Sequence, residues 1–245
     1  KKEICDVLVV FRNKIIIFSD KYIEFGKYEK TDFKRIDVLW KRWYKKAVSN
    51  SVDQIYGAER NLKNNPENIY LDKECETKFP VTISFTENTK IYRVAVAHGA
   101  RDACKDLFNG GSGSLILTND VDTAGSPFTI TYEAFGKGFV HVLDDVTLDI
   151  ILNHLDTITD FTDYLDEKEK FMVERRIICT GEENLLACYL SNFDENKRRY
   201  HFNFPEEFDS IIIDDLIYSD FISKGKYIFK KENEKISYLW DDILD

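Results

Sequence analysis

The chain has 245 residues, of which 43% are hydrophobic and 14% aromatic, and only four are prolines. This composition is typical of a folded globular protein with a large core, and it argues against long disordered linkers. No run of about 18 apolar residues is present, which excludes a membrane-spanning helix. We therefore expect a globular protein without a membrane partner.

The net charge of −10 is unevenly distributed along the chain. Residues 1–65 hold 15 Lys and Arg against 9 Asp and Glu, whereas the rest of the chain holds 19 against 35. Nucleic-acid binding depends on the local field around the phosphates and not on the total charge. The basic N-terminal part is therefore compatible with DNA. The acidic remainder is compatible with solubility, with a protein partner, or with autoinhibition of the basic face.

The cysteines and histidines form no metal-ligand motif. The five cysteines are widely spaced, form no CxxC pair and favour free thiols in a reducing cytoplasm. The chain also lacks an HExxH motif, a P-loop and a nucleophile elbow. It begins with Lys-Lys-Glu-Ile and no apolar segment, so we expect no signal peptide. The missing initiator Met leads us to expect that it starts inside a longer protein. The five cysteines are Cys5, Cys75, Cys104, Cys179 and Cys188.

Two apolar, β-branched runs open the chain and predict a tight hairpin of buried strands. They are Val7–Phe11 and Ile15–Phe18, with three residues between them. Acids are rare in buried strands because an unpaired buried charge costs several kcal/mol, yet Asp6 begins the first strand and Asp20 and Lys21 end the second. In an antiparallel hairpin these ends lie side by side. The carboxylates and the ammonium therefore converge in a geometry suited to a divalent cation.

A long amphipathic helix is predicted over Trp40–Leu62, and it ends before Pro66. Its apolar stripe contains small residues that allow close approach to a sheet, and Gln54 lies among them. A buried Gln needs partners for its amide, which are either the candidate site or a strand-edge backbone group. The stripe comprises Trp40, Trp43, Ala47, Ser51, Gln54, Ala58 and Leu62. Four basic residues fall mainly off the stripe and are candidates for phosphate contacts: Lys41, Arg42, Lys45 and Lys46.

This layout resembles the core of the PD-(D/E)xK nuclease superfamily, which includes restriction and repair endonucleases. In that core an Asp opens one strand, the next strand ends in (Asp/Glu)-x-Lys, and a helix follows. Asp6 matches the Asp, Lys21 matches the Lys, and Gln54 resembles a helix Gln that supports the metal site in several branches. The resemblance covers residues 1–100. It implies a Mg²⁺- or Mn²⁺-dependent endonuclease acting on DNA, with RNA left open, in a setting such as microbial antiviral defence.

The chain departs from this pattern at Ser19, which stands where the second acid belongs. Side chains alternate along a strand, so Ser19 and Lys21 share a face and Asp20 points to the other. A bulge at the strand end would turn Asp20 toward the site. Alternatively Glu3 or Glu59 supplies the second carboxylate, or Asp6 and Asp20 are solvated acids. In the last case the protein is an inactive nuclease-like module that acts as a nucleic-acid sensor or an interaction platform.

Further elements follow the helix. Alternation predicts a strand over Phe79–Phe85 and another over Lys90–Gly99 that joins the sheet. His98 at its end either reaches the substrate or, as we favour, is a hydrogen-bonded structural histidine. A short helix is expected over Arg101–Phe108, and then a glycine-rich turn and short strands. These strands are Leu115–Leu117, Pro127–Tyr132 and Phe139–Val142.

From Asp144 onward the chain becomes acidic and helical. Apolar spacing predicts one helix over Thr147–Met172, capped by Asp144 or Asp145, with a solvated acidic outer face. We therefore expect an α/β protein of the α+β type, with a restriction-endonuclease-like core at 1–143. A second mixed helix and strand region at 144–245 would pack on the first and bind a partner. A remaining alternative is an acidic interaction domain that binds no nucleic acid.

Overall fold

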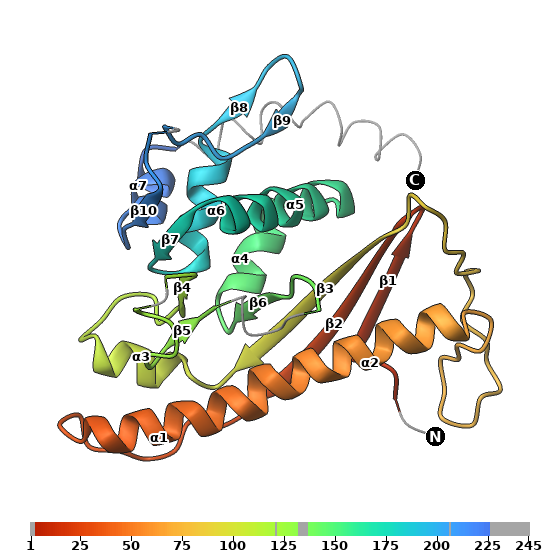
Figure 1. Cartoon of the computed structure of the whole chain (residues 1–245), viewed down its shortest axis with the longest axis horizontal. Coiled ribbons are helices and arrows are strands. Elements are labelled where there is room, and N and C mark those ends of the chain that lie inside the picture. Colours follow the sequence, from red (N-terminus) through yellow and green to blue (C-terminus); the bar gives the residue numbers. More distant parts are fainter. Residues whose placement is uncertain (1–2, 121, 132–136, 206, 226–245) are drawn as a thin grey trace.

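The computed structural model describes residues 3–120, 122–131, 137–205 and 207–225. It contains two four-stranded mixed sheets with helices on both sides, which confirms a mixed α/β fold (Figure 1). In the first sheet the strand order is β1-β2-β3-β6. These strands are β1 (Val7–Phe11), β2 (Lys14–Tyr22), β3 (Lys90–His98) and β6 (His141–Asp144).

The predicted hairpin is present, but only its second strand is buried; β1 is an edge strand, with Val7 and Phe11 exposed. β1 and β2 pair antiparallel from Val7 opposite Phe18 to Phe11 opposite Lys14. Arg12, at the turn, has a positive φ of 55°. β2 runs parallel to β3, and β3 runs parallel to β6. The carboxyl ends of these three parallel strands therefore meet at one edge of the sheet, which is also the edge where antiparallel β1 begins.

The predicted helix is present, but it is longer and interrupted. α1 (Phe33–Tyr44) leads through a π-helical turn (Lys45–Ser49) into α2 (Asn50–Asn64). The helix begins seven residues before the predicted start at Trp40, because the Asp32 side chain accepts a hydrogen bond from the Arg35 amide and caps it. Its end just before Pro66 is as predicted.

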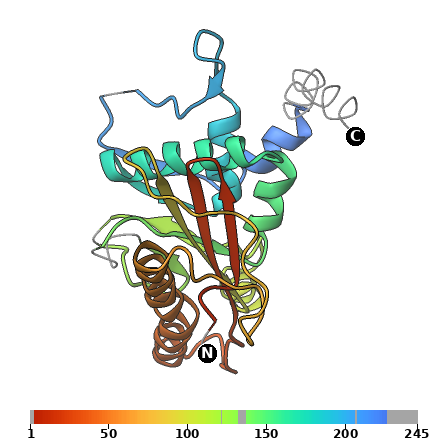
Figure 2. The same ribbon diagram turned by 90° about the vertical axis from the view of Figure 1, so that its right-hand side faces the viewer.

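Two hydrophobic cores cover the two faces of the first sheet. The first core, which contains Ile15, Ile17 and the Trp40 and Trp43 rings, lies under α1 and α2. The second core, which contains Ile16, Val94 and Phe161, lies under α4 (Thr147–His154) and α5 (Ile158–Glu174). Figures 1 and 2 show the α1–α2 helix crossing one face while α4 and α5 lie on the other. Alternate residues of each strand thus enter different cores, as a buried strand requires.

Two predicted elements are wrong. Phe79–Phe85 forms no strand, although its alternating side chains pack on the first core. The one isolated bridge nearby joins Lys78, just before this segment, to Tyr70. The helix predicted over Thr147–Met172 is two helices, α4 (Thr147–His154) and α5 (Ile158–Glu174). The break occurs because the Thr157 hydroxyl accepts the Asp160 amide proton and starts a new helix.

The second sheet joins the two halves of the chain. β7 (Arg176–Cys179) pairs in parallel with β10 (Ser210–Ile213) and antiparallel with β4 (Ile116–Thr118), which pairs with β5 (Thr129–Ile130). Strands from before position 143 (β4 and β5) and from after it (β7 and β10) therefore belong to one hydrogen-bonded sheet. The remaining elements are α3 (Arg101–Leu107), α6 (Glu182–Leu190), β8 (Phe193–Asp194), β9 (Arg199–Tyr200) and α7 (Ile217–Ser223).

Acids on the outer side of α5 are used in ion pairs. Asp163 contacts Lys14 at 3.4 Å and Asp166 contacts Lys90 at 2.7 Å, so these acids tie α5 to the first residues of β2 and β3 and are not simply solvated, as the sequence had predicted. All five cysteines are free thiols. Within the part of the chain that the structure describes, no helix is long and apolar enough to span a bilayer.

His141 at the start of β6 gives the fold a defined response to pH. Burial, and then the charges of Lys168, Lys90 and Arg93, hold the pKa of His141 well below its usual 6.5. Below pH 6.5 the unfolded chain binds a proton at His141 that the folded protein does not. The stability that neutral His141 contributes to the folded protein is therefore fully present above pH 6.5 and is lost as the pH falls below it.

We expect the wild type to lose about 1.4 kcal/mol of stability per pH unit below that point through this group alone. We measure the free energy of unfolding by urea denaturation between about pH 7 and about pH 5. With falling pH, the variant His141→Gln should lose less of this free energy than the wild type does, and the difference should be the His141 contribution. Other groups titrate in both proteins and cancel in the comparison. Equal slopes would contradict the assignment.

Candidate functional site

Asp6 and Asp20 meet at the edge where β1 begins and β2 ends. The Asp20 amide donates a hydrogen bond of 2.6 Å to Oδ2 of Asp6, and the Asp6 amide donates to the Phe18 carbonyl. The side chains of Asp6 and Asp20 are both exposed to solvent. The hairpin therefore brings the Asp6 carboxylate against the main chain of Asp20, at the open strand end that the sequence predicted.

Strand alternation places Ser19 and Lys21 on the face covered by α2. Ser19 follows Ile15 and Ile17 on the side of the first core and is fully buried. Its hydroxyl has no hydrogen-bond partner among the described residues. Lys21, two residues further on, is partly buried. Asp6 alternates with Leu8 and Val10, which pack against the same core. The α2 face of the edge thus carries Asp6, Ser19 and Lys21.

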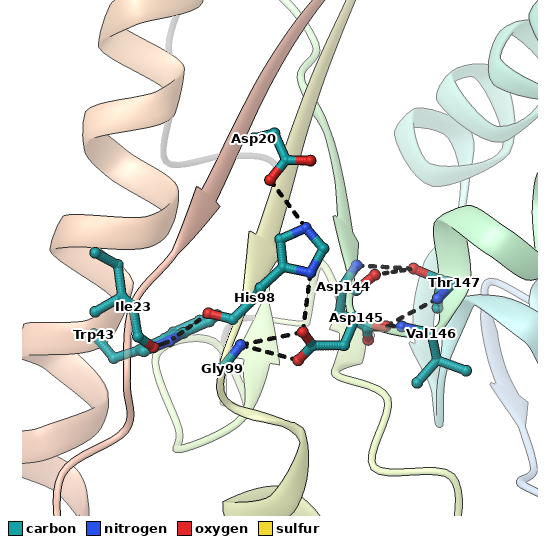
Figure 3. A network of polar contacts seen from close by, with 9 residues as sticks. All are labelled: Asp20, Ile23, Trp43, His98, Gly99, Asp144, Asp145, Val146 and Thr147. Carbon is teal, nitrogen blue, oxygen red and sulfur yellow. Dashed lines mark hydrogen bonds and ion pairs between the residues drawn. The ribbon is translucent and has the colours of Figure 1, made fainter. Parts of the chain in front are cut away.

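Asp20 points to the other face and contacts His98. Its Oδ1 lies 3.0 Å from Nε2 of His98, while Nδ1 of His98 lies 2.9 Å from Oδ1 of Asp145 (Figure 3). His98 alternates with Val94 and Val96, which belong to the second core. One imidazole is therefore bracketed by two carboxylates, each from the end of a neighbouring strand. Our expectation that His98 is hydrogen-bonded is confirmed, and its partners are Asp20, a predicted site residue, and Asp145, which the sequence offered only as a helix cap.

The main chain holds Asp145 rigidly. The Gly99 amide donates to both carboxylate oxygens of Asp145, at 3.0 and 3.3 Å. Gly99 has a φ of +98°, and an added Cβ would lie 2.3 Å from the Ile23 carbonyl oxygen. Only glycine fits there. The Trp43 indole donates to the same Ile23 oxygen at 2.9 Å and to the His98 carbonyl at 3.3 Å, which anchors this turn to α1.

Asp144 has a structural role beside this network. Its carboxylate accepts the amides of Leu115, Val146 and Thr147 at 2.7 to 3.2 Å in the turn before α4, but the N-cap of α4 is Val146, so the cap predicted at Asp144 or Asp145 is wrong by one or two residues. Burial, opposed by these hydrogen bonds and assisted by the Glu183 carboxylate, raises its pKa to about 6. Asp145 was predicted only as the alternative cap. The sequence signal that could have indicated its contact with His98 was its position directly after a buried strand.

The other sequence candidates are placed as follows. Gln54 is partly buried on α2, one turn after buried Ser51 and one turn before buried Ala58, and α2 packs on β2 and β3. Glu3 is exposed and, with Asp6, lines a cavity of about 740 Å³.

Glu59 is held in an ion pair away from the strand end. Its oxygens accept from Nε and a terminal nitrogen of Arg93, at 2.6 and 2.9 Å, and from Lys63 at 2.7 Å. Burial alone would raise the pKa of Glu59, but these hydrogen bonds outweigh it and lower the pKa. Glu59 is therefore fully engaged, and among the acids we considered as replacements for Ser19 only Glu3 stays near Asp6.

The four predicted phosphate-binding residues are exposed on the outer side of α1 and the π-helical turn. Lys41 forms an ion pair of 2.7 Å with Asp37 on the preceding turn of α1. Such an exposed pair is weak and exchanges readily for a phosphate. The exposed residues are Lys41, Arg42, Lys45 and Lys46.

At this strand end the Asp6 carboxylate lies on the α2 face and the Asp20 carboxylate on the opposite face, so the structure does not bring the two together around one cation. Over the described residues, no three His, Cys, Asp or Glu side chains gather closely enough to hold a metal ion by themselves. Mg²⁺ commonly binds through one or two carboxylates and completes its shell with water and substrate phosphate. The hard oxygen donors of Asp6 and Asp20 fit that ion in kind. No protein-family model, curated protein or solved structure matches this chain, so its function is inferred from its own geometry.

Proposed function

We propose that the chain is a magnesium-dependent phosphodiesterase with a restriction-endonuclease-like core, and that it hydrolyses DNA. The observation that carries this proposal is the contact between the Asp6 carboxylate and the Asp20 amide at 2.6 Å, at an edge that also bears Lys21. Asp6 and Lys21 at adjoining strand ends, beneath a helix that carries Gln54, match part of the arrangement that the nuclease resemblance implies, while Asp20 lies at the same strand end on the opposite face.

Each residue has a role that follows from its place. Asp6 would hold Mg²⁺ or Mn²⁺, and Asp20 would join it only by turning from His98 to the α2 face; the ion would supply charge neutralisation at the phosphate and a bound water of lowered pKa. Lys21 stabilises the negative charge that develops on the phosphate oxygens or orients the attacking water. Gln54 orients these groups by hydrogen bonding through its amide. The exposed Lys and Arg side chains of α1 and the π-helical turn hold the phosphate backbone of the DNA without reading the base sequence.

A second candidate function is a catalytically inactive nuclease-like module that binds nucleic acid as a sensor. The observation that favours it is the contact of Asp20 with His98, on the face opposite Lys21, together with the hydroxyl of Ser19 in place of an acid. In this case the basic side of α1 still binds phosphates, while the strand end performs no hydrolysis.

A cleavage assay separates the two functions. Purified protein is incubated with supercoiled plasmid in Mg²⁺, in Mn²⁺ and with a chelator, and binding to the same DNA is measured over a range of salt concentrations. We expect nicked or linear plasmid only with metal, and binding that weakens steeply with salt. Salt-sensitive binding without cleavage would favour the sensor, whereas no binding even at low salt would overturn both functions.

A further inference from the structure

β1 is the last strand of its sheet, and one side of its main chain is unpaired. The strand order is β1-β2-β3-β6, and Figure 1 shows β1 at the outer edge. The hairpin closes with Phe11 opposite Lys14, so every second residue back from Phe11 is hydrogen-bonded to β2. Leu8 and Val10 therefore direct their amides and carbonyls away from β2. No main-chain hydrogen bond from another described segment reaches them.

A cavity of about 740 Å³ opens beside the first half of this edge. One side of the cavity is lined by residues from Glu3 to Leu8, and the other side by residues of the segment 68–79, which we call the 68–79 hairpin. Cavities that bind ligands typically measure from about 300 to about 1,000 Å³. This one is therefore large enough to hold part of another molecule against the edge of β1.

The hairpin that forms the second wall has a fixed shape. Two main-chain hydrogen bonds of 2.9 Å join its arms, from the Leu71 amide to the Thr77 carbonyl and from the Phe79 amide to the Ile69 carbonyl. The Asp72 carboxylate accepts two further amides in the turn, at 3.0 and 2.6 Å, and these hydrogen bonds lower its pKa. The cavity is therefore already formed in the free protein, with a charged carboxylate in its wall.

Apolar side chains on both walls remain open to solvent. Val7 on β1 and Leu71 on the 68–79 hairpin line the cavity and are 51% and 62% exposed. An occupant that covers them gains hydrophobic stabilisation. The strand itself, Val-Leu-Val-Val-Phe, has neither the Lys nor the Pro that commonly protects an exposed edge from pairing with another chain.

The charges around the cavity favour a basic occupant. Among the described lining residues, Glu3, Asp6 and Asp72 are acidic and Lys73 is the only cation. This wall repels the phosphates of a nucleic acid and attracts Lys and Arg side chains. The occupant expected here is therefore different from the DNA expected on α1.

We propose that the β1 edge and its cavity bind a basic, extended peptide segment of a partner protein, which joins the sheet as an additional strand. The main chain of the segment pairs with Leu8 and Val10, as in other cases of strand addition. Because side chains directly opposite each other share a face, its basic residues lie beside Asp6 and its apolar residues beside Val7. This inference goes beyond the proposed nuclease function and requires no metal ion.

The test uses the full chain and the peptide Lys-Val-Lys-Val-Lys-Val, labelled at its amino end and amidated at its carboxyl end. Binding is measured by fluorescence anisotropy at low salt, without metal and without DNA. We expect saturable binding of this peptide. The charge-inverted peptide, with Glu in place of each Lys, should bind at least about tenfold more weakly.

Methylation of the peptide amides tests the strand pairing itself. One version is N-methylated at every Lys and the other at every Val, so each loses the amide donors of one edge only. We expect one version to bind about tenfold or more weakly, because its hydrogen bonds to β1 are lost, and the other to bind as the parent does. Loss at the Lys amides indicates antiparallel addition, and loss at the Val amides indicates parallel addition.

A matched pair of variants tests the place of binding. Leu71→Ser removes an exposed apolar group from the cavity and should weaken binding of the parent peptide about five- to tenfold. Leu216→Ser makes the same change at a residue that is 67% exposed just before α7, outside the cavity. It should bind the peptide as the wild type does, which separates the cavity from a general attraction of the acidic protein for basic peptides.

Four results would overturn the inference. They are no saturable binding of the parent peptide, equal binding of the charge-inverted peptide, equal effects of the two methylation patterns, and equal effects of Leu71→Ser and Leu216→Ser. Sedimentation of the chain alone identifies the main competing occupant: a dimer that binds no peptide would show that a second copy covers the edge. None of these results bears on DNA cleavage, so the proposed function stands or falls separately.

Discussion

Replacing Asp6 with alanine is expected to lower the rate of metal-dependent DNA cleavage roughly a thousandfold. The substitution removes a proposed metal ligand and the acceptor of the Asp20 amide, whose hydrogen bond of 2.6 Å joins the two acids. Lys21→Ala is expected to lower the rate roughly a hundredfold but to leave Mn²⁺ affinity within a few-fold of the wild type, because an ammonium group binds no metal. The two variants should therefore differ in metal binding as well as in rate.

The measurements are single-turnover cleavage of a labelled duplex and Mn²⁺ titration of each variant. Asp53→Ala is the matched control, since Asp53 is an exposed acid on α2 with no role at the strand end. It should cleave like the wild type. Full activity in Asp6→Ala would refute the placement of the site, and loss of Mn²⁺ binding in Lys21→Ala would refute the division of roles.

The variant Lys168→Met is expected to destabilise the fold by about 3–5 kcal/mol. Lys168 on α5 and Glu182 on α6 form an ion pair of 2.5 Å in which each side chain is only 2% exposed. The Tyr164 hydroxyl donates to the other oxygen of Glu182 at 2.6 Å. Burial, reinforced by the Glu182 carboxylate, raises the pKa of Tyr164 well above its usual value, so the phenol remains a donor. Without Lys168 a carboxylate is left buried with one neutral partner.

The double variant Lys168→Met/Glu182→Gln is expected to recover most of this loss, because no buried charge remains and the amide oxygen still accepts from Tyr164. Urea denaturation reports both values as shifts of the midpoint at constant slope. A loss below about 1 kcal/mol in the single variant, or a double variant that is no more stable than the single one, would contradict this account.

Elements governed by local periodicity were predictable from the sequence. The hairpin, β3, α3 and the end of α2 lie where the apolar pattern and Pro66 indicated. Elements decided by a capping side chain were predicted less well. Asp32 starts α1 earlier than the apolar stripe does, and Thr157 divides the acidic helix in two. A cap is one hydrogen bond, which periodicity does not register.

The strand expected over Phe79–Phe85 failed for a different reason. Its alternation reflects packing on the first core, where Ile83 is buried and Phe79 and Phe85 lie alongside. A strand also needs hydrogen bonds to a neighbouring strand, and Phe79–Phe85 joins neither sheet; the one bridge beside it is from Lys78 to Tyr70. Alternation reports which side chains are buried, not whether a hydrogen-bonding neighbour is available.

The sequence by itself determined that two acids lie at the open end of the hairpin, one where the first strand begins and one near the end of the second. It also determined that Ser19 and Lys21 point to one face of the sheet and Asp20 to the other. These properties follow from the two-residue period of a strand and require no knowledge of other elements. Only the tertiary structure decided what Asp20 contacts on its face, namely His98. His98 and Asp145 are 47 positions apart in sequence and meet because β3 and β6 are parallel neighbours with their carboxyl ends at one edge. That pairing is set by helix and sheet packing over the whole chain, which no local pattern encodes.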